Sequence, residues 1–279
     1  MQQTQCPSGN LVIFTDLDGT LLDSRTYRCD EAHEALEQLR ARGIPVVLVS
    51  SKTWAEIEPL RDQLRNDHPC IVENGGALLI PVGYFPFPLS TTGVSGAYQV
   101  VEFGTPYVVL RQALKEIAQE TGLVLKGCGD LSVDEVAAQT GLSPAQATLA
   151  KQRKYDEPFI IEGLLTVSAA LATAITSRGL RWTRGDRWQH LTGPHDKGHA
   201  VSHLIRCYRQ VAADQGQHCT TVAIGNSLND LPMLAAVDIP VLVQRQDGSY
   251  EPSIDLPGLI RAPAPGPIGW NQALLSLLG

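Results

Sequence analysis

Short apolar runs that alternate with helical patterns limit the folds open to this chain more than any other feature. The runs at 11–15 (LVIFT), 44–50 (IPVVLVS) and 70–80 (CIVENGGALLI) are short and largely continuous, as is typical of strands covered on both faces. Apolar residues at helical spacing over 29–43 and 53–64 separate these runs. Strand, helix, strand, helix, strand predicts a parallel sheet with right-handed crossovers.

The composition changes near residue 84, where YFPFPLSTTGVSGAY brings proline, glycine and serine together. A mixture of helical and strand patterns follows, and the buried runs at 219–225 and 239–243 then resume the parallel pattern. We therefore predict an α/β fold with a doubly wound parallel-sheet core, formed by residues 1–83 and 192–279. An α+β module at 84–191 is predicted to interrupt this core.

Charge and composition exclude several function classes. The formal net charge of −7 argues against nonspecific binding to nucleic acid, which requires a basic face. No apolar run approaches the roughly 20 residues of a membrane span, and the N-terminus shows no signal-peptide pattern. The six cysteines form no CxxC pair, which favours a reducing compartment. We therefore expect a cytoplasmic protein that binds neither nucleic acid nor membrane.

Asp16 and Asp18 stand two apart where the first strand should end. Like charges so close raise each other's pKa, so solvent, a cation or a turn that separates the side chains must offset the repulsion. Taken alone, the pair is also compatible with an ordinary turn before Gly19, because aspartate favours turns.

Other polar groups are expected beside these acids, because ligands gather at the carboxyl ends of the strands in an open parallel sheet. Ser50 follows the second strand and Lys197 opens a predicted helix. The group after the strand at 219–225 comprises Asn226, Asn229 and Asp230. A carboxylate nucleophile, a second acid, a hydroxyl, a lysine and a metal ligand are what phosphoryl transfer through an aspartyl-phosphate requires.

The motifs DLDGT, VS, DKG and GNSLND, in this order, resemble the four motifs of haloacid dehalogenase superfamily phosphatases, and the insert resembles their type IIB cap. Longer stretches, among them VSSKT, ENGGA and RWTRGDRWQHLTGPHDKGHAV, are similar to mannosyl-3-phosphoglycerate phosphatases. The resemblance covers nearly the whole chain and implies Mg²⁺-dependent hydrolysis of mannosyl-3-phosphoglycerate to mannosylglycerate, a compatible solute. A phosphatase for glucosyl-3-phosphoglycerate or another phosphosugar, a phosphomutase and a noncatalytic sugar-phosphate sensor are the alternatives.

The resemblance implies a role for each motif residue. Asp16 attacks phosphorus, while Asp18 protonates the leaving oxygen and then activates water. Ser50 and Lys197 hold the phosphoryl oxygens. The implied Mg²⁺ ligands are Asp16, the carbonyl of Asp18 and Asn226. Asp230 is implied to lie near the metal or the lysine, and Asn229 near the phosphate.

Asn226 departs from the superfamily pattern, in which an aspartate is usual at this position. An amide oxygen is still a hard ligand for Mg²⁺, but one negative charge is missing. We therefore expect weaker Mg²⁺ binding than in an aspartate-bearing relative, and a loss of activity stays open.

Further residues are predicted on the substrate side. Arg153 is a candidate from the resemblance, because arginine binds a carboxylate in a planar, bidentate way. Arg184 in the turn at 184–186 is a second candidate, and His190 is either a substrate contact or a buried structural histidine. The residues expected at the strand ends are Lys52, Thr53, Asn74 and Gly75.

Aromatic and histidine side chains elsewhere favour packing over binding. Trp54, Trp182 and Trp188 are expected to pack in the core or cap rather than to stack on a sugar. No zinc site is predicted from the three histidines spaced four apart, because the first should precede the helix and no HExxH glutamate is present. These histidines are His195, His199 and His203.

Overall fold

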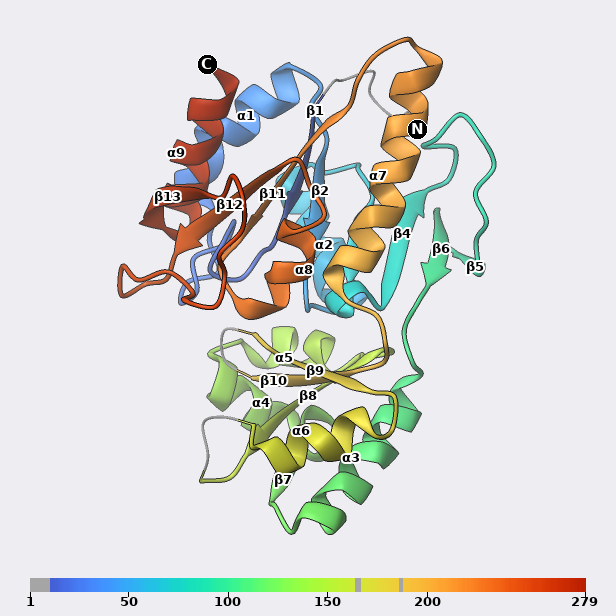
Figure 1. Ribbon diagram of the computed structural model, residues 1–279, viewed down its shortest axis with the longest axis vertical. Helices are drawn as coiled ribbons and strands as arrows, with labels where there is room; N and C mark the ends of the chain where they lie inside the picture. Colours follow the sequence, from blue (N-terminus) through green and yellow to red (C-terminus); the bar gives the residue numbers. More distant parts are fainter. Residues whose placement is uncertain (1–10, 164–166, 186–187) are drawn as a thin grey trace.

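The computed structural model describes residues 11–163, 167–185 and 188–279, and the larger of its two sheets has nine strands (Figure 1). In spatial order these are β13 (Ile260–Pro265), β12 (Ile239–Gln244), β11 (Thr220–Gly225), β1 (Leu11–Thr15), β2 (Val46–Val49), β3 (Cys70–Val72), β4 (Ala77–Pro81), β6 (Tyr98–Glu102) and β5 (Gly93–Ser95). The strands from β13 to β3 are parallel, and β4, β6 and β5 are antiparallel to their neighbours. The predicted α/β fold with a doubly wound core is confirmed.

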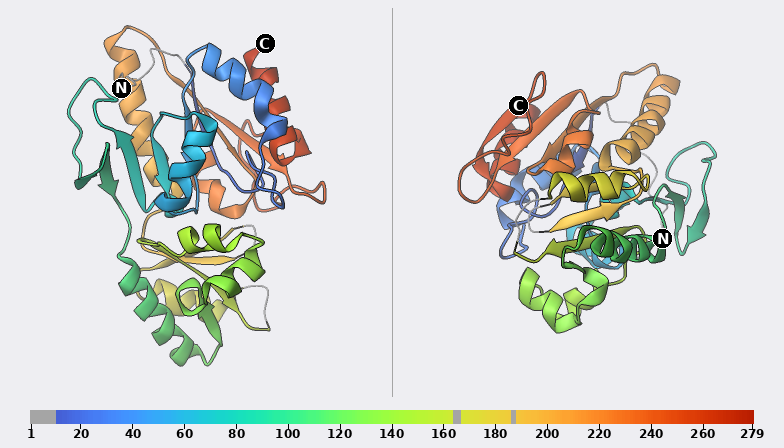
Figure 2. Two further views of the ribbon diagram at one scale, coloured as in Figure 1. Left: turned by 180° about the vertical axis from the view of Figure 1, so that it is seen from behind. Right: turned by 60° about the horizontal axis from the view of Figure 1, so that its bottom comes forward.

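Helices cover both faces of this sheet because its central strands are apolar on both sides. In β1, Val12 and Phe14 pack in one buried cluster with α7 and α8, whereas Ile13 packs in another with α1, α2 and α9. The two helical layers lie on either side of the sheet in Figures 1 and 2. The helices and 3-10 turns of the core are η1 (Asp30–Ala32), α1 (His33–Ala41), α2 (Trp54–Leu64), η2 (Glu73–Gly75), α7 (Lys197–Asp214), η4 (Leu228–Asp230), α8 (Leu231–Leu234) and α9 (Gly266–Leu278).

The chain that follows β4 stays in the core. β6 pairs with β4 and β5 pairs with β6, both in antiparallel register. The predicted start of the inserted module at residue 84 is therefore too early, because residues 93–102 extend the core sheet. The prolines and glycines that suggested a linker lie in the loop before β5 and in its hairpin with β6.

The inserted module, called the cap from here on, is built on an antiparallel sheet in the order β7-β8-β10-β9. Helices α3 and α6 pack on one face of this sheet, around Phe159 and Leu191, and α4 and α5 pack in a second cluster that contains Trp188. The elements of the cap are α3 (Tyr107–Thr121), β7 (Leu125–Gly127), η3 (Cys128–Asp130), α4 (Val133–Thr140), α5 (Pro144–Ala150), β8 (Asp156–Ile161), α6 (Ala169–Thr176), β9 (Arg181–Arg184) and β10 (Gln189–Thr192).

Two segments, 103–106 and 193–196, connect the cap to the core. They lie side by side, since a Cβ built on Gly193 would come within 2.2 Å of Thr105 Oγ1. The backbone N–H groups of Phe103 and Gly104 both donate to the carbonyl of Gly76 at 2.9 Å, which fixes the outgoing segment on the turn between β3 and β4. Within the three described ranges, no helix is both long enough and apolar enough to cross a bilayer.

Candidate active site

Asp16 directly follows β1 and is buried at the carboxyl edge of the core sheet. Its backbone N–H donates to the carbonyl of Ile224 at 2.9 Å, which continues the pairing of β1 with β11. The two carboxylate oxygens have separate partners: Oδ1 accepts from Lys197 Nζ at 2.7 Å and Oδ2 accepts from Thr20 Oγ1 at 3.0 Å. The side chain is thus held in one orientation.

Lys197 is the first residue of α7 and is fully buried. Its Nζ lies 2.7 Å from Asp16 Oδ1 and 2.6 Å from Asp230 Oδ1. Burial opposes the charge of the amine, but the two carboxylates outweigh burial and raise the pKa of Lys197. The lysine is therefore a fixed positive charge beside Asp16.

The acids around Asp16 carry more charge than Lys197 offsets. Burial raises the pKa of Asp16 to about 7, Asp230 and Asp18 add to the rise, and Lys197 opposes it. A second cation next to Asp16 would reverse this effect. The electrostatics of the site thus favour the binding of a positive ion.

Asp18 faces Lys52, whose Nζ lies 2.9 Å from Asp18 Oδ2 and 3.7 Å from Glu56 Oε1. Burial opposes the charge of Lys52, but Asp18 and Glu56 outweigh it and raise the pKa of the lysine. The other oxygen of Asp18, Oδ1, is buried and has no hydrogen-bond partner within the described part of the chain. One oxygen of Asp18 is thus anchored and the other is available to a ligand or a proton.

The oxygens next to Asp16 fit a Mg²⁺ ion. Asn226 Oδ1 is buried and unpartnered among the described residues, and the Nδ2 of the same amide donates to the Asp18 carbonyl at 3.3 Å. Carboxylate, carbonyl and amide oxygens are ligands that Mg²⁺ takes. Of the two roles predicted for Asp230, the structure favours contact with the lysine, because its Oδ2 also accepts the N–H groups of Asn226 and Ser227 at 2.9 and 3.1 Å.

Ser50 and Thr53 both follow β2, but their side chains have different partners. Ser50 is buried at the end of β2 and its Oγ accepts the backbone N–H of Lys52 at 3.2 Å. Thr53 caps α2, where its Oγ1 accepts the N–H of Glu56 at 3.2 Å and donates to the carbonyl of Leu149 in the cap at 3.0 Å. Thr53 thus begins a helix and contacts the cap, and it is not among the residues that line the cavity between core and cap.

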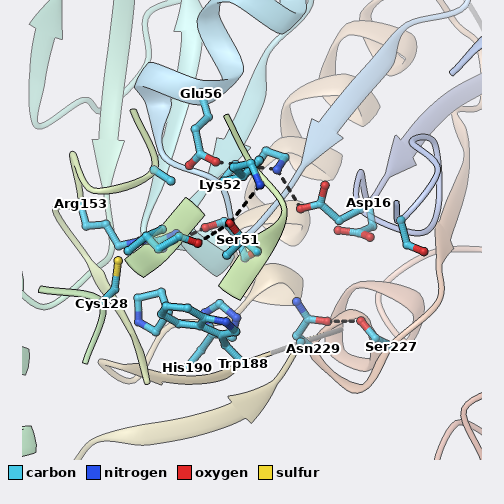
Figure 3. Close-up of a pocket in the computed structure, with 18 of the residues that line it drawn as sticks. Asp16, Ser51, Lys52, Glu56, Cys128, Arg153, Trp188, His190, Ser227 and Asn229 are labelled. Carbon is cyan, nitrogen blue, oxygen red and sulfur yellow. Dashed lines mark hydrogen bonds and ion pairs between the residues drawn. The ribbon is translucent and has the colours of Figure 1, made fainter. Parts of the chain in front are cut away.

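A cavity between the core and the cap is bordered by six of the predicted residues, namely Asp16, Asp18, Lys52, Arg153, His190 and Asn229 (Figure 3). Its core side is formed by Asp16, Asp18, Ser24, Tyr27, Ser51, Lys52, Glu56, Ser227 and Asn229. Its cap side is formed by Cys128, Val136, Thr140, Leu142, Ala150, Arg153, Pro158, Gly185, Trp188 and His190. Charged groups therefore gather at the core end, and the cap supplies apolar surface together with Arg153 and His190.

Arg153 and His190 share a buried carboxylate. His190 Nδ1 lies 2.8 Å from Asp156 Oδ2, and Arg153 Nη1 lies 3.5 Å from the same oxygen. Arg153 Nη1 also donates to the carbonyl of Ser51 in the core at 3.1 Å, whereas its Nε is buried with no partner in the described ranges. Both side chains are oriented by the protein and both border the cavity.

Asn74 and Gly75 lie behind the cavity rather than at its surface. Asn74 Nδ2 donates to Asp156 Oδ2 at 2.8 Å, and Asn74 Oδ1 accepts from Asn229 Nδ2 at 3.0 Å. Gly75 has φ +93°, and a Cβ there would come within 2.2 Å of the carbonyl of Asp196. The structure places Arg184 at the exposed end of β9, outside the cavity lining; residue 186 of the predicted turn lies outside the described ranges.

The three histidines spaced four apart do not converge. His195 is buried before α7, and the rings of His199 and His203 pack against Phe103 with centroids 4.8 and 5.7 Å away. The described ranges contain no cluster of three or more histidine, cysteine or acidic side chains arranged to bind a metal. The oxygen set at Asp16 differs from such a cluster because it uses a backbone carbonyl and an amide.

Sequence reasoning missed three residues of the site. Glu56 lines the cavity and contacts Lys52, which helical spacing from Lys52 could have indicated. Trp188 directly precedes β10 and packs in the buried cluster of the cap, as expected, but it also borders the cavity, which the sequence did not indicate. Asp156 holds Arg153 and His190, and no local signal in the sequence marks that role.

Comparison with known proteins defines the class. Residues 13–81 match the family of haloacid dehalogenase-like hydrolases. A crystal structure from Thermoplasma acidophilum is 17% identical, covers 96% of this chain and 97% of its own, and has a TM-score of 0.67. A subclass IIB sugar phosphatase of the haloacid dehalogenase superfamily is 16% identical with the same coverage and a TM-score of 0.61. The fold is that of a capped haloacid dehalogenase-type hydrolase.

Curated relatives narrow this class. The glucosyl-3-phosphoglycerate/mannosyl-3-phosphoglycerate phosphatase of Methanococcoides burtonii is 46% identical over 268 residues, which are 96% of this chain and 97% of the relative. The protein of that name from Persephonella marina is 38% identical at the same coverage, and the mannosyl-3-phosphoglycerate phosphatase of Pyrococcus furiosus is 36% identical over 83% of this chain and 90% of the relative. The chain belongs to this family of phosphatases, which confirms the resemblance seen in the sequence.

Proposed function

We propose that this phosphatase removes the phosphate from glucosyl-3-phosphoglycerate and mannosyl-3-phosphoglycerate. The observation that carries the proposal is the pair of relatives, 46% and 38% identical over 96% of the chain, whose names give both substrates. The sequence favours the mannosyl compound, but these relatives support both sugars. Two positively charged side chains border the cavity, Lys52 on its core side and Arg153 on its cap side. This pair matches a ligand that carries a phosphate and a carboxylate.

Hydrolysis is proposed to pass through an aspartyl-phosphate on Asp16. A carboxylate oxygen of Asp16 forms a bond to phosphorus while the bond from phosphorus to the ester oxygen breaks, and Asp18 gives that oxygen a proton. Asp18 then takes a proton from the water that attacks phosphorus and frees Asp16. The unpartnered Oδ1 of Asp18 is suited to carry this proton, because Oδ2 is held by Lys52.

Lys197 and Ser50 are proposed to hold the phosphoryl oxygens, since both are buried beside the strand ends that carry Asp16. Asp16, the Asp18 carbonyl and Asn226 would hold Mg²⁺, which when bound neutralises charge on the phosphate and on the acids. On the cap, the free Nε of Arg153 is proposed to meet the glycerate carboxylate. Trp188 and His190 are proposed to border the sugar.

Two further features support a small-molecule enzyme in a reducing compartment. The cysteines within the described residues are free thiols, which suits the cytosol. The formal net charge of −7 does not suit binding to nucleic acid.

The test is phosphate release from both sugar phosphoglycerates with Mg²⁺, beside Asp16→Asn. Asparagine keeps the shape of the side chain but is a far weaker nucleophile, so we expect release to fall by at least about 10⁴-fold. Release by the wild type that persists in the variant would exclude Asp16 as the nucleophile. No release by folded, metal-saturated wild type would overturn the substrate assignment.

A further inference from the structure

The turn between β3 and β4 has a left-handed backbone that includes Glu73, a residue type that does not favour this conformation. Three consecutive residues are left-handed: Glu73 (φ +48°), Asn74 (φ +56°) and Gly75 (φ +93°). Glycine accepts such a conformation readily and asparagine adopts it more often than most residues, but glutamate does so at a cost. Conformations of this kind persist where surrounding contacts impose them, and they gather at functional sites.

The side chain of Glu73 points from this turn into the cap. Its carboxylate accepts three consecutive backbone N–H groups there: Lys154 at 2.9 Å, Tyr155 at 2.8 Å and Asp156 at 3.0 Å. Glu73 is 1% exposed, so water does not compete for these hydrogen bonds. A core carboxylate thus holds the cap backbone directly after Arg153.

The cap returns the contact through Asp156. Asp156 is fully buried and accepts from Asn74 Nδ2 at 2.8 Å, while it also orients His190. Asn74 Oδ1 accepts from Asn229 Nδ2 at 3.0 Å, and Asn229 borders the cavity. A continuous set of hydrogen bonds therefore runs from His190 in the cap to Asn229 in the core.

Close packing surrounds these hydrogen bonds. A Cβ on Gly76 or on Gly104 would come within 2.4 Å of Tyr155 Cβ, so the tyrosine lies between the turn and the outgoing connection. Gly75 makes the same kind of approach to the carbonyl of Asp196, the residue before Lys197. The turn thus contacts the cap and the start of α7 together.

We propose that Glu73 and Asn74 are positioning residues that lock the cap in the closed state, so that Arg153 and His190 face the phosphate site at Asp16. Neither residue touches the reacting atoms: Glu73 acts through the backbone of 154–156, and Asn74 acts through Asp156 and Asn229. The inference rests on the proposed function, in which Arg153 and His190 contact the glycerate and the sugar.

Glu73→Gln is the main variant, because glutamine keeps the size of the side chain and removes its charge. Burial raises the pKa of Glu73 to about 7, although Arg153 and the amides oppose the rise, so the comparison is made at pH 8, where the carboxylate is charged. Asn74→Gly is the second variant, because glycine tolerates the left-handed backbone and removes both side-chain hydrogen bonds. Glu162→Gln is the matched control, since Glu162 lies in the cap, as residues 154–156 do, and its carboxylate is half exposed and paired to Lys126.

The first readout is hydrogen exchange of the backbone amides of 154–156, which needs no substrate. Loss of charge-assisted hydrogen bonds is expected to speed this exchange about tenfold or more in Glu73→Gln, while amides of β1 and β11 keep their rates. The Glu162→Gln control is expected to match the wild type. Unchanged exchange at 154–156 would overturn the proposal.

The second readout compares a sugar phosphoglycerate with para-nitrophenyl phosphate, which has neither carboxylate nor sugar for the cap to contact. In both variants we expect KM for the sugar phosphoglycerate to rise at least about fivefold, while kcat/KM for the small ester stays within twofold. A parallel loss on both substrates would indicate general damage to the site and refute the lock. If wild-type protein cleaves neither sugar phosphoglycerate, the proposed function fails, and the exchange experiment still decides whether Glu73 holds the cap.

Discussion

Replacing Asn226 by aspartate changes one charge at the site where the sequence departs from its superfamily. Asn226 is 3% exposed, its Nδ2 donates to the Asp18 carbonyl at 3.3 Å, and its N–H is held by Asp230. Aspartate loses that donor and adds a negative charge beside Asp16, Asp18 and Asp230. The variant should therefore be less stable without metal and should bind Mg²⁺ more tightly.

The size of both effects follows from the contacts. The lost hydrogen bond costs about 0.5–1.5 kcal/mol, and one unit charge about 5 Å from another costs about 3 kcal/mol at an effective dielectric constant of 20. Because Lys197 offsets part of the repulsion, we expect the metal-free variant to lose about 2–4 kcal/mol. The added charge should tighten Mg²⁺ binding by at least about tenfold, which corresponds to about 1.4 kcal/mol.

The assay is calorimetric titration with Mg²⁺, together with urea unfolding in chelator and in saturating Mg²⁺. Asn66→Asp is the matched control. The Nδ2 of Asn66 donates to the carbonyl of Val46 at 2.8 Å, and Val46 begins β2 at the end opposite the site. The control should lose stability in both conditions, whereas Asn226→Asp should regain its stability in Mg²⁺. Equal or weaker Mg²⁺ affinity in Asn226→Asp would refute the assignment of Asn226 as a ligand.

Two further predictions concern the charges around Asp16. Lys197→Met leaves Asp16 and Asp230 buried without their shared cation, so we expect the free energy of unfolding, measured in urea, to fall by about 3–5 kcal/mol. Phosphate release should fall by about 10²- to 10³-fold. A change in the free energy of unfolding within about 1 kcal/mol would contradict the buried pairing. Burial raises the pKa of Asp16 in the metal-free protein from 3.8 to about 7. The native state then binds a proton that the unfolded chain releases, so the free energy of unfolding should fall as pH rises through this window. Mg²⁺ binding should therefore release about one proton at pH 6 and none at pH 9. Calorimetry in buffers of different ionisation enthalpy measures this release. Equal proton release at the two pH values would contradict the raised pKa of Asp16.

The sequence was sufficient for the core of the site because that core is local. Asp16, Ser50 and Asn226 each follow a buried apolar strand, and parallel strands bring their carboxyl ends to one edge. Lys197 was also predictable, because a motif at the start of a helix marks it. The contacts of these residues therefore follow from strand order and from short motifs.

Sequence reasoning fell short where a role depends on how distant segments pair. Residues 93–102 belong to the core sheet because they pair with β4, and their glycines and the prolines before them hid this pairing. Thr53 follows a strand end as Lys52 does, but it begins a helix. Glu73 and Asp156 acquire their partners only when the cap is in place, so neither periodicity nor a motif could have revealed them.

The two connecting segments at 103–106 and 193–196 determine how strong the contact between the cap and the core has to be. Because both segments are short and adjacent, the cap meets the core as part of one molecule, at an effective concentration on the order of millimolar or above. A contact whose dissociation constant between separate proteins would be in the millimolar range is then sufficient to keep the cap closed for much of the time. Such a weak contact also permits the repeated opening that product release requires.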